Sequence, residues 1–159
     1  MADRIEGGIM IKKIDITNPK LAEEVLNIQI PSYNVEAEIL DFYELPPLKD
    51  TVETLQQCEE TFFGYYVNEE LCGVISMKVD KGIIDIHRLM VHPKHFRKGI
   101  AKILLNFVES NIEDSKTLIV STGSKNIPAV TFYLKNGFIQ TEETRLGEHL
   151  SLTSFKKNI

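Results

Sequence analysis

Residues 86–105 constrain this chain more than any other segment, because an apolar strand-like run, a short cationic loop and an amphipathic helix follow one another there. Five apolar residues recur at i, i+3, i+4, i+7 and i+8: Ile100, Ile103, Leu104, Phe107 and Val108. This spacing predicts a helix with one buried face. Gly99 then stands at the helix N-terminus, where backbone N–H groups lack intrahelical acceptors and the helix dipole is positive. The segment therefore predicts a cradle for an anion.

The charges around this loop favour the same interpretation. Lys94, Arg97, Lys98 and Lys102 are cationic, and no Asp or Glu occurs between residues 86 and 108. A phosphorylated ligand is the first hypothesis for such a loop. The alternative is an ordinary glycine turn whose cationic rim is solvated, since one glycine with flanking cations is a common pattern.

Two other phosphate-binding loops are excluded by inspection. The chain has no G-x-x-x-x-G-K-[ST] pattern, which disfavours a Walker-type nucleotide site. It also lacks a G-x-G-x-x-G run between a strand and a helix, which disfavours a dinucleotide-binding fold. The remaining candidate is a cradle with the single small-residue pair Gly99-x-Ala101.

This segment resembles motif A of the GNAT superfamily of N-acetyltransferases, whose signature is [Q/R]-x-x-G-x-[G/A] after a strand that holds the pantetheine arm of acetyl-CoA. The signature matches residues 96–101, except that Phe96 stands where the family usually has Gln or Arg. The resemblance implies that acetyl-CoA is the co-substrate. It implies these cofactor-binding residues in and near the motif: Leu89, Met90, Val91, Phe96, Arg97, Lys98, Gly99, Ile100, Ala101 and Lys102.

Residues 124–138 resemble motif B of the same family, N-x-x-A-x-x-x-Y-x-x-x-G-F. Every fixed position is matched, by Asn126, Ala129, Tyr133, Gly137 and Phe138. The resemblance adds Asn126 to the cofactor-binding residues and implies that Tyr133 is the acid that protonates the sulfur of coenzyme A. The alternative for Tyr133 is an ordinary core aromatic at the end of a helix.

Local chemistry supports a helix in this second motif independently. Asn126 is a good N-cap, Pro128 fits the first turn, and Asn136-Gly137 is a left-handed stop signal. We expect the buried stripe of this helix to consist of Ile127, Val130 and Leu134.

Strand-like runs predict a mixed and mostly antiparallel sheet. Short turns separate residues 61–67, 71–79 and 83–91, which favours antiparallel hairpins. Residues 117–122 lie between the two motif helices and predict a buried parallel strand, and residues 138–144 and 149–155 predict a final antiparallel pair. The fold class is α/β (α+β), with helices on both faces. The resemblance implies the GNAT acyl-CoA N-acyltransferase fold, in which the motif A strand and the next strand splay apart.

The N-terminal part is predicted to contain a strand over residues 11–16 and an amphipathic helix from Asn18-Pro19 to about Pro31. Residues 35–60 predict an irregular helical region broken by Pro46-Pro47. Residues 1–9 show no periodicity, so we expect them to be a leader or extension before a single domain at 10–159. A chain of 159 residues fits one such domain.

The implied reaction, acetyl transfer to an amine, needs a group that removes a proton from the nucleophile. Strand alternation places Asp85, His87, Leu89 and Val91 on one face, which would direct both titratable side chains toward the cleft. His87 is the first candidate base because an ordinary histidine pKa of about 6.5 suits the task, and Asp85 is the second. Water alone, with both side chains on a half-exposed strand face, is the alternative.

The acceptor pocket is predicted from a family habit and from charge. Family members usually build it from the first helices and the last hairpin, here residues 33–60 and 142–151. Residues 33–60 carry eight carboxylates and one lysine, a local charge of −7. With the candidate residues Tyr33, Glu36, Phe42 and Tyr43, this composition favours a cationic amine. The alternative for most of these acids is a solvated helix face.

Other classes of function are disfavoured. His87, His92 and His95 lack the remaining ligands of a metal set, so no metal is expected. A net charge of −5 argues against a nucleic-acid binder, and no apolar run has the roughly 20 residues that a membrane helix needs. Cys58 and Cys72 suggest no disulfide framework, so a cytoplasmic location is expected. We expect a monomer or a homodimer. A catalytically silent CoA-binding regulatory module is the alternative function, although Asp85, His87 and Tyr133 argue against it.

Overall fold

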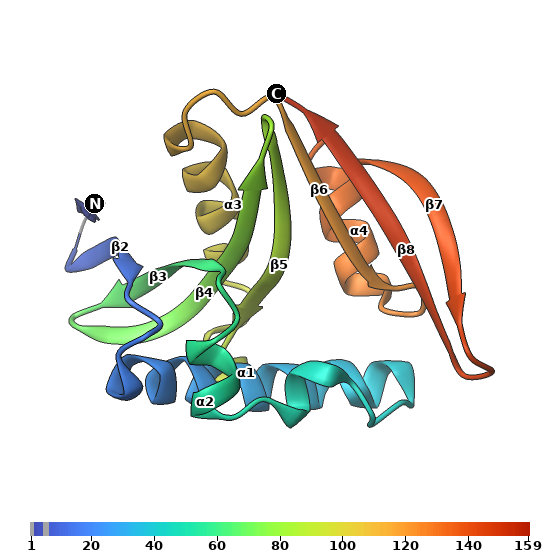
Figure 1. The fold of residues 1–159 in the computed structure, drawn as a ribbon, viewed down its shortest axis with the longest axis horizontal. Helices are drawn as coiled ribbons and strands as arrows, with labels where there is room; N and C mark the ends of the chain where they lie inside the picture. Colours follow the sequence, from blue (N-terminus) through green and yellow to red (C-terminus); the bar gives the residue numbers. More distant parts are fainter. Residues whose placement is uncertain (1, 5–6) are drawn as a thin grey trace.

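The computed structural model describes residues 2–4 and 7–159. One mixed sheet, ordered β1-β2-β3-β4-β5-β6-β8-β7, runs through the described part of the chain (Figure 1). In chain order the strands are β1 (Ala2–Arg4), β2 (Ile9–Ile14), β3 (Thr61–Val67), β4 (Glu70–Asp80), β5 (Ile83–Val91), β6 (Thr117–Gly123), β7 (Ile139–Leu146) and β8 (Leu150–Asn158). Strands β5 and β6 pair in parallel, and the other neighbours pair antiparallel. The predicted fold class is therefore confirmed.

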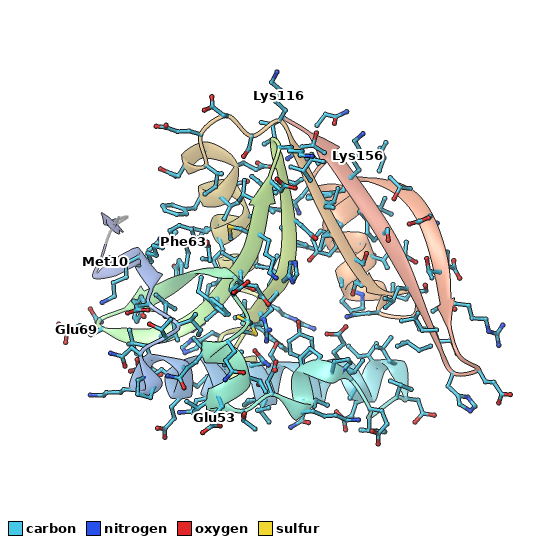
Figure 2. All side chains as sticks on the ribbon, in the orientation of Figure 1. Met10, Glu53, Phe63, Glu69, Lys116 and Lys156 are labelled. Atoms are coloured by element: carbon cyan, nitrogen blue, oxygen red, sulfur yellow. The ribbon has the colours of Figure 1, made fainter. Side chains whose placement is uncertain are left out.

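Helices cover both faces of this sheet. Helix α1 (Pro19–Leu40) and the short α2 (Val52–Gln56) pack on one face, where Val25 and Leu55 meet Val74 of β4. Helices α3 (Ile100–Asn111) and α4 (Ile127–Lys135) pack on the other face. There Phe107 of α3 meets Phe63 of β3 edge to face, with ring centroids 5.1 Å apart (Phe63 is labelled in Figure 2).

The first helix is longer than the sequence indicates. The prediction that it ends near Pro31 is wrong, because α1 continues to Leu40 with Pro31 inside it. The proline removes one helical N–H and normally kinks or ends a helix. Burial of Ala37 and Leu40 against the rest of the chain offsets that cost, and the Phe42 amide donates to the Ala37 carbonyl at 3.0 Å to close the helix.

The extended part of α1 reaches the end of β6. A Cβ added to Gly123 would lie 2.7 Å from Cδ2 of Leu40, so only a glycine permits this close approach. Figure 1 shows α1 running beneath the lower ends of the strands, with its C-terminal half below β6 and β8. The residues after Pro31 are thus placed across the open end of the sheet.

A bulge in β5 changes which side chains face each helix layer. Met77 pairs with Ile86 and Ser76 pairs with Arg88, so His87 is an additional residue in the strand. Ile86 and Leu89 consequently both pack on the α3 side, although they are three positions apart. The prediction that Asp85, His87, Leu89 and Val91 share one face is therefore wrong.

The predicted stripe of α4 is right for Val130, which packs against the core, and wrong for Ile127 and Leu134. The exposed fractions of Ile127 and Leu134 are 62% and 51%, whereas Tyr133 is buried at 6%. Apolar residues nearly surround this short helix, so its sequence permits more than one buried face. The ring of Tyr133 packs with Phe138 and Phe155, at centroid distances of 5.3 and 5.6 Å, and this aromatic cluster sets the orientation.

The remaining boundaries agree closely with prediction. Strands β3 and β5 have the predicted bounds, and β6 pairs in parallel with β5. Strand β2 begins at Ile9, two residues before the predicted start, and Ala2–Arg4 pair with it as β1. The predicted leader, residues 1–9, includes residues 1, 5 and 6, which lie outside the described residues, and it stays a prediction.

Arg88 connects the sheet to the helices on the α1 side. Its guanidinium donates to both carboxylate oxygens of Glu60, at 3.0 and 3.1 Å, and also to the side chains of Asp50 and Gln29, at 2.6 and 3.0 Å. Burial raises the pKa values of Asp50 and Glu60, but their hydrogen bonds to Arg88 and other partners outweigh burial and hold both below their ordinary range. Segments far apart in sequence thereby share one buried cation.

Replacing Arg88 by methionine should lower the free energy of unfolding by about 3–5 kcal/mol at neutral pH, because two carboxylates lose their cation. The difference in unfolding free energy between the wild type and the variant should become smaller as the pH falls below about 4. In the wild type, the carboxylate pKa values are depressed, so the stability they provide is lost as the pH falls through them. In the variant, burial raises the same pKa values, so protonation of these carboxylates on acidification relieves the destabilisation. Urea unfolding at a series of pH values measures both effects.

Lys49→Met is the matched control, since Lys49 pairs with Glu44 at 2.7 Å on the surface, with side chains 64% and 71% exposed. This exposed pair should contribute little to stability, because solvent screens its charges. If Arg88→Met cost no more than Lys49→Met, the Arg88 network would not be a structural element.

Candidate active site

The site lies where β5 and β6 separate. Their parallel pairing covers only Ile83–Asp85 against Thr117–Ile119, and the strands then diverge (Figure 1). A cavity of about 620 Å³ is bounded by the far end of β5, the second half of α1 and the starts of α3 and α4. From β5 it is lined by Leu89, Met90 and Val91, which the sequence had predicted as cofactor-binding.

The loop before α3 presents backbone amides to this cavity. Arg97 and Gly99 have φ values of 65° and 74°, so both are in the left-handed region, and Gly99 caps α3. The first hydrogen bond of the helix runs from the Ile103 amide to the Gly99 carbonyl, at 3.1 Å. Among the described residues, no amide from 97 to 101 donates a hydrogen bond to a protein acceptor. Free amides at a helix N-terminus can donate hydrogen bonds to an anion.

Most of the predicted cradle residues are brought together. Phe96, Arg97, Gly99, Ile100, Ala101 and Lys102 line the cavity. Lys98 does not, and its Nζ lies 3.4 Å from Nδ1 of His95 instead. His95 itself lines the cavity and was not predicted as a site residue.

Helix α4 contributes its cap and its buried tyrosine. The Asn126 side chain accepts a hydrogen bond from the Ala129 amide at 3.3 Å and lines the cavity, as do Ala129, Phe132 and Tyr133. Burial raises the pKa of the Tyr133 phenol above its ordinary value of 10, and the nearby Glu36 raises it further. The phenol therefore keeps its proton at neutral pH.

Helix α1 supplies one face of residues that sequence reasoning largely missed. Ser32, Val35, Glu36 and Ile39 line the cavity at i, i+3, i+4 and i+7. That spacing is a detectable helical signal, but all four residues lie beyond the helix end that was expected near Pro31. Of these residues only Glu36 had been predicted. Burial raises the pKa of its carboxyl, and a hydrogen bond from Asn126 offsets part of that effect.

The other predicted acceptor residues lie elsewhere. Phe42 packs in a small cluster with Ala37, Leu40 and Leu45, and Tyr43 is 59% exposed. Tyr33 is partly buried on α1 but does not line the cavity. Burial raises the pKa of Tyr33, and Glu36 is the next largest cause, which indicates that the two side chains are near each other.

The two predicted base residues lie next to the cavity lining rather than in it. His87 is flanked by two carboxylates, with Nε2 3.4 Å from Oδ2 of Asp85 and Nδ1 3.6 Å from Oε2 of Glu60. Neither Asp85 nor His87 lines the cavity. The bulge at His87 accounts for this placement, because it separates the faces of Asp85 and Leu89. A catalytic role for either residue stays a prediction.

The described residues contain neither a cluster of metal ligands nor a membrane-spanning helix. In residues 2–4 and 7–159, no three His, Cys, Asp or Glu side chains come together as a metal site. Over the same residues, no helix has both the length and the apolar character of a membrane span.

Solved structures share this fold across nearly the whole chain. The PaiA N-acetyltransferase of Thermoplasma acidophilum, in complex with coenzyme A, has a TM-score of 0.75 at 19% identity, covering 95% of this chain and 99% of that one. The ribosomal-protein-S18-alanine N-acetyltransferase of Escherichia coli also has a TM-score of 0.75, at 15% identity, covering 100% and 94%. These likenesses show the GNAT fold.

Sequence comparison gives the family. The UPF0157 protein YqkA of Bacillus subtilis (strain 168) is 39% identical over 146 residues, which is 92% of this chain and 43% of that relative. This chain thus spans less than half the length of that relative. A family model described as an acetyltransferase (GNAT) domain matches residues 32–159, which include both motifs and all of the predicted cofactor-binding residues. The chain belongs to the GNAT acetyltransferase family.

Proposed function

We propose that this protein transfers an acetyl group from acetyl-CoA to a primary amine, by direct attack of the amine within a ternary complex. The observation that carries this proposal is a single cavity that combines unpaired amides, an unpaired strand edge and a buried phenol. The Thermoplasma acidophilum structure, which has the same fold, is a complex with coenzyme A, and this supports the choice of cofactor.

In the proposed complex the pyrophosphate accepts hydrogen bonds from the amides of residues 97–101. Arg97 and Lys102 add positive charge beside it. The pantetheine arm lies along Leu89–Val91, where β5 has no partner on its β6 side. Asn126, at the start of α4, contacts the pantetheine arm from the side of that helix. The proposed contacts use amides and strand edges, which explains why Phe96 can replace the usual Gln or Arg.

The chemical step needs three functions. Backbone N–H groups near Leu89–Val91 polarise the thioester carbonyl as charge develops on its oxygen. The amine nitrogen attacks the carbonyl carbon, and the C–S bond breaks. Tyr133 gives its proton to the leaving sulfur. The proton of the amine passes to a base, for which His87, Asp85 and water were the sequence-based candidates.

Thiol release from acetyl-CoA tests the proposal directly. Wild-type protein is assayed with n-butylamine, diaminobutane, a lysine-containing peptide and a peptide with a free N-terminal amine. We expect amine-dependent thiol release and an acetylated product by mass spectrometry. Tight acetyl-CoA binding without acetylation of any of these amines would contradict the proposal and favour the silent CoA-binding module.

Gly99→Ala should weaken acetyl-CoA binding by about tenfold or more, measured by calorimetry. A Cβ at Gly99 meets no protein atom within 4 Å, so it projects into the open space that the pyrophosphate is proposed to occupy. Gly147→Ala is the matched control: Gly147 has φ 75° and equally open surroundings but does not line the cavity. Both changes carry a backbone cost of about 1–2 kcal/mol, so equal affinity losses would overturn the cradle.

Tyr133→Phe should lower kcat by roughly 10²-fold and leave acetyl-CoA affinity nearly unchanged, because it removes the proton donor and little volume. Steady-state kinetics and calorimetry measure the two quantities. The matched control is Tyr65→Phe, which makes the same change at another buried tyrosine outside the cavity lining. Wild-type turnover in the Tyr133 variant would return this residue to a purely packing role.

A further inference from the structure

We propose that Glu36 of α1, rather than His87 or Asp85, receives the ammonium group of the acceptor and removes its proton. The acceptor is then a cationic primary amine that enters the cavity from the α1 side. This inference rests on the proposed acetyl transfer and assigns its base and substrate class.

Position is the first argument. Glu36 lines the same cavity as Leu89 and Tyr133, where the thioester carbonyl and sulfur are proposed to lie. A base must be within hydrogen-bond reach of the proton that it removes, directly or through one water. Of Glu36, Asp85 and His87, only Glu36 lines this cavity. The imidazole in the lining, His95, directly precedes the loop that is proposed to hold the cofactor phosphates.

Charge balance is the second argument. Three carboxylates near α1 have cations: Arg88 contacts Asp50 and Glu60, and Lys49 contacts Glu44. Glu38, on the same helix as Glu36, is exposed to solvent. Within the described residues, Glu36 makes no ion pair at 4.0 Å or less, and its polar neighbour is the neutral Asn126. A half-buried carboxylate without a cation is a site that an ammonium group would neutralise.

The surroundings of Glu36 also suit proton removal. Tyr33 on α1 and Tyr133 on α4 are close enough for Glu36 to raise their pKa values, and the cationic or titratable residues His95, Arg97 and Lys102 line the same cavity. Burial raises the pKa of the Glu36 carboxyl, which makes it a stronger base than an exposed glutamate. By contrast, His87 lies between Asp85 and Glu60, and neither Asp85 nor His87 lines the cavity.

The proton inventory balances without another reactant. Glu36 takes one proton from the ammonium, and the neutral nitrogen forms a bond to the carbonyl carbon. The C–S bond breaks, and the sulfur takes the proton of Tyr133. The attacking nitrogen loses its second proton to water. Tyr133 then regains a proton from water, and Glu36 releases its proton to water as the neutral amide leaves.

Glu36→Gln tests the assignment with two amines. n-Butylamine is an ammonium ion at neutral pH, whereas trifluoroethylamine is largely neutral there and needs no base before attack. We expect kcat/KM for n-butylamine to fall by roughly 10²-fold, and its decrease at low pH, the acidic limb of the pH profile, to disappear. The kcat/KM for trifluoroethylamine should fall far less. Acetyl-CoA affinity and thermal unfolding should stay unchanged, which shows that the variant is folded and loaded.

Two controls complete the experiment. Glu38→Gln removes an exposed carboxylate two positions along the same helix and should leave both amines at wild-type rates. His87→Ala should keep the acidic limb. If Glu36→Gln kept the limb and the n-butylamine rate, or if His87→Ala removed the limb, the assignment of Glu36 would be overturned. A wild-type protein that acetylates neither amine, nor any in the panel above, would instead overturn the proposed function.

Discussion

The structure depends on a pairing that stops early. Strands β5 and β6 are held in parallel register over three residues each and then separate. A strand edge without a partner leaves backbone donors and acceptors that need other partners. Helices α1, α3 and α4 surround this opening, and each contributes side chains or amides to one cavity. The site therefore forms where the hydrogen bonds between two neighbouring strands of the sheet end.

The β5 bulge and Arg88 determine what faces that opening. The bulge at His87 sends Leu89 and Val91 toward α3 and Arg88 toward α1. Arg88 then binds Gln29 on α1, Asp50 before α2 and Glu60 before β3. Helix α1 continues past Gln29 to Glu36 and Ile39, which line the cavity. The contact between Arg88 and Gln29 therefore also positions this wall of the cavity. A change at Arg88 is therefore expected to act on both stability and the acceptor side of the site.

Local signals predicted the cofactor side of this site, and non-local packing decided the rest. The glycine cap of α3 and the cap of α4 were predicted from short local patterns. The course of α1 past Pro31 depends on Ala37 and Leu40 finding a buried surface, part of it formed by Gly123 more than 80 residues away. The bulge in β5 depends on its register with β4. The helical spacing after Pro31 does not by itself outweigh the proline, and the bulge leaves no signature in β5. Glu36 was therefore predicted from composition, and the base from an alternation that the bulge interrupts.

The distribution of charge in the cavity suits a reaction that removes a charge. Arg97 and Lys102 lie on the loop and helix proposed to hold the anionic cofactor, and Glu36 lies on the opposite helix. An anionic cofactor and a cationic acceptor are therefore attracted to different walls of one space, which orients both before reaction. Acetylation converts the ammonium into a neutral amide, and the attraction to Glu36 disappears with the charge. The same carboxylate that favours binding of the acceptor then no longer retains the product, so in the proposed reaction the chemical step itself weakens the contact that must break for release.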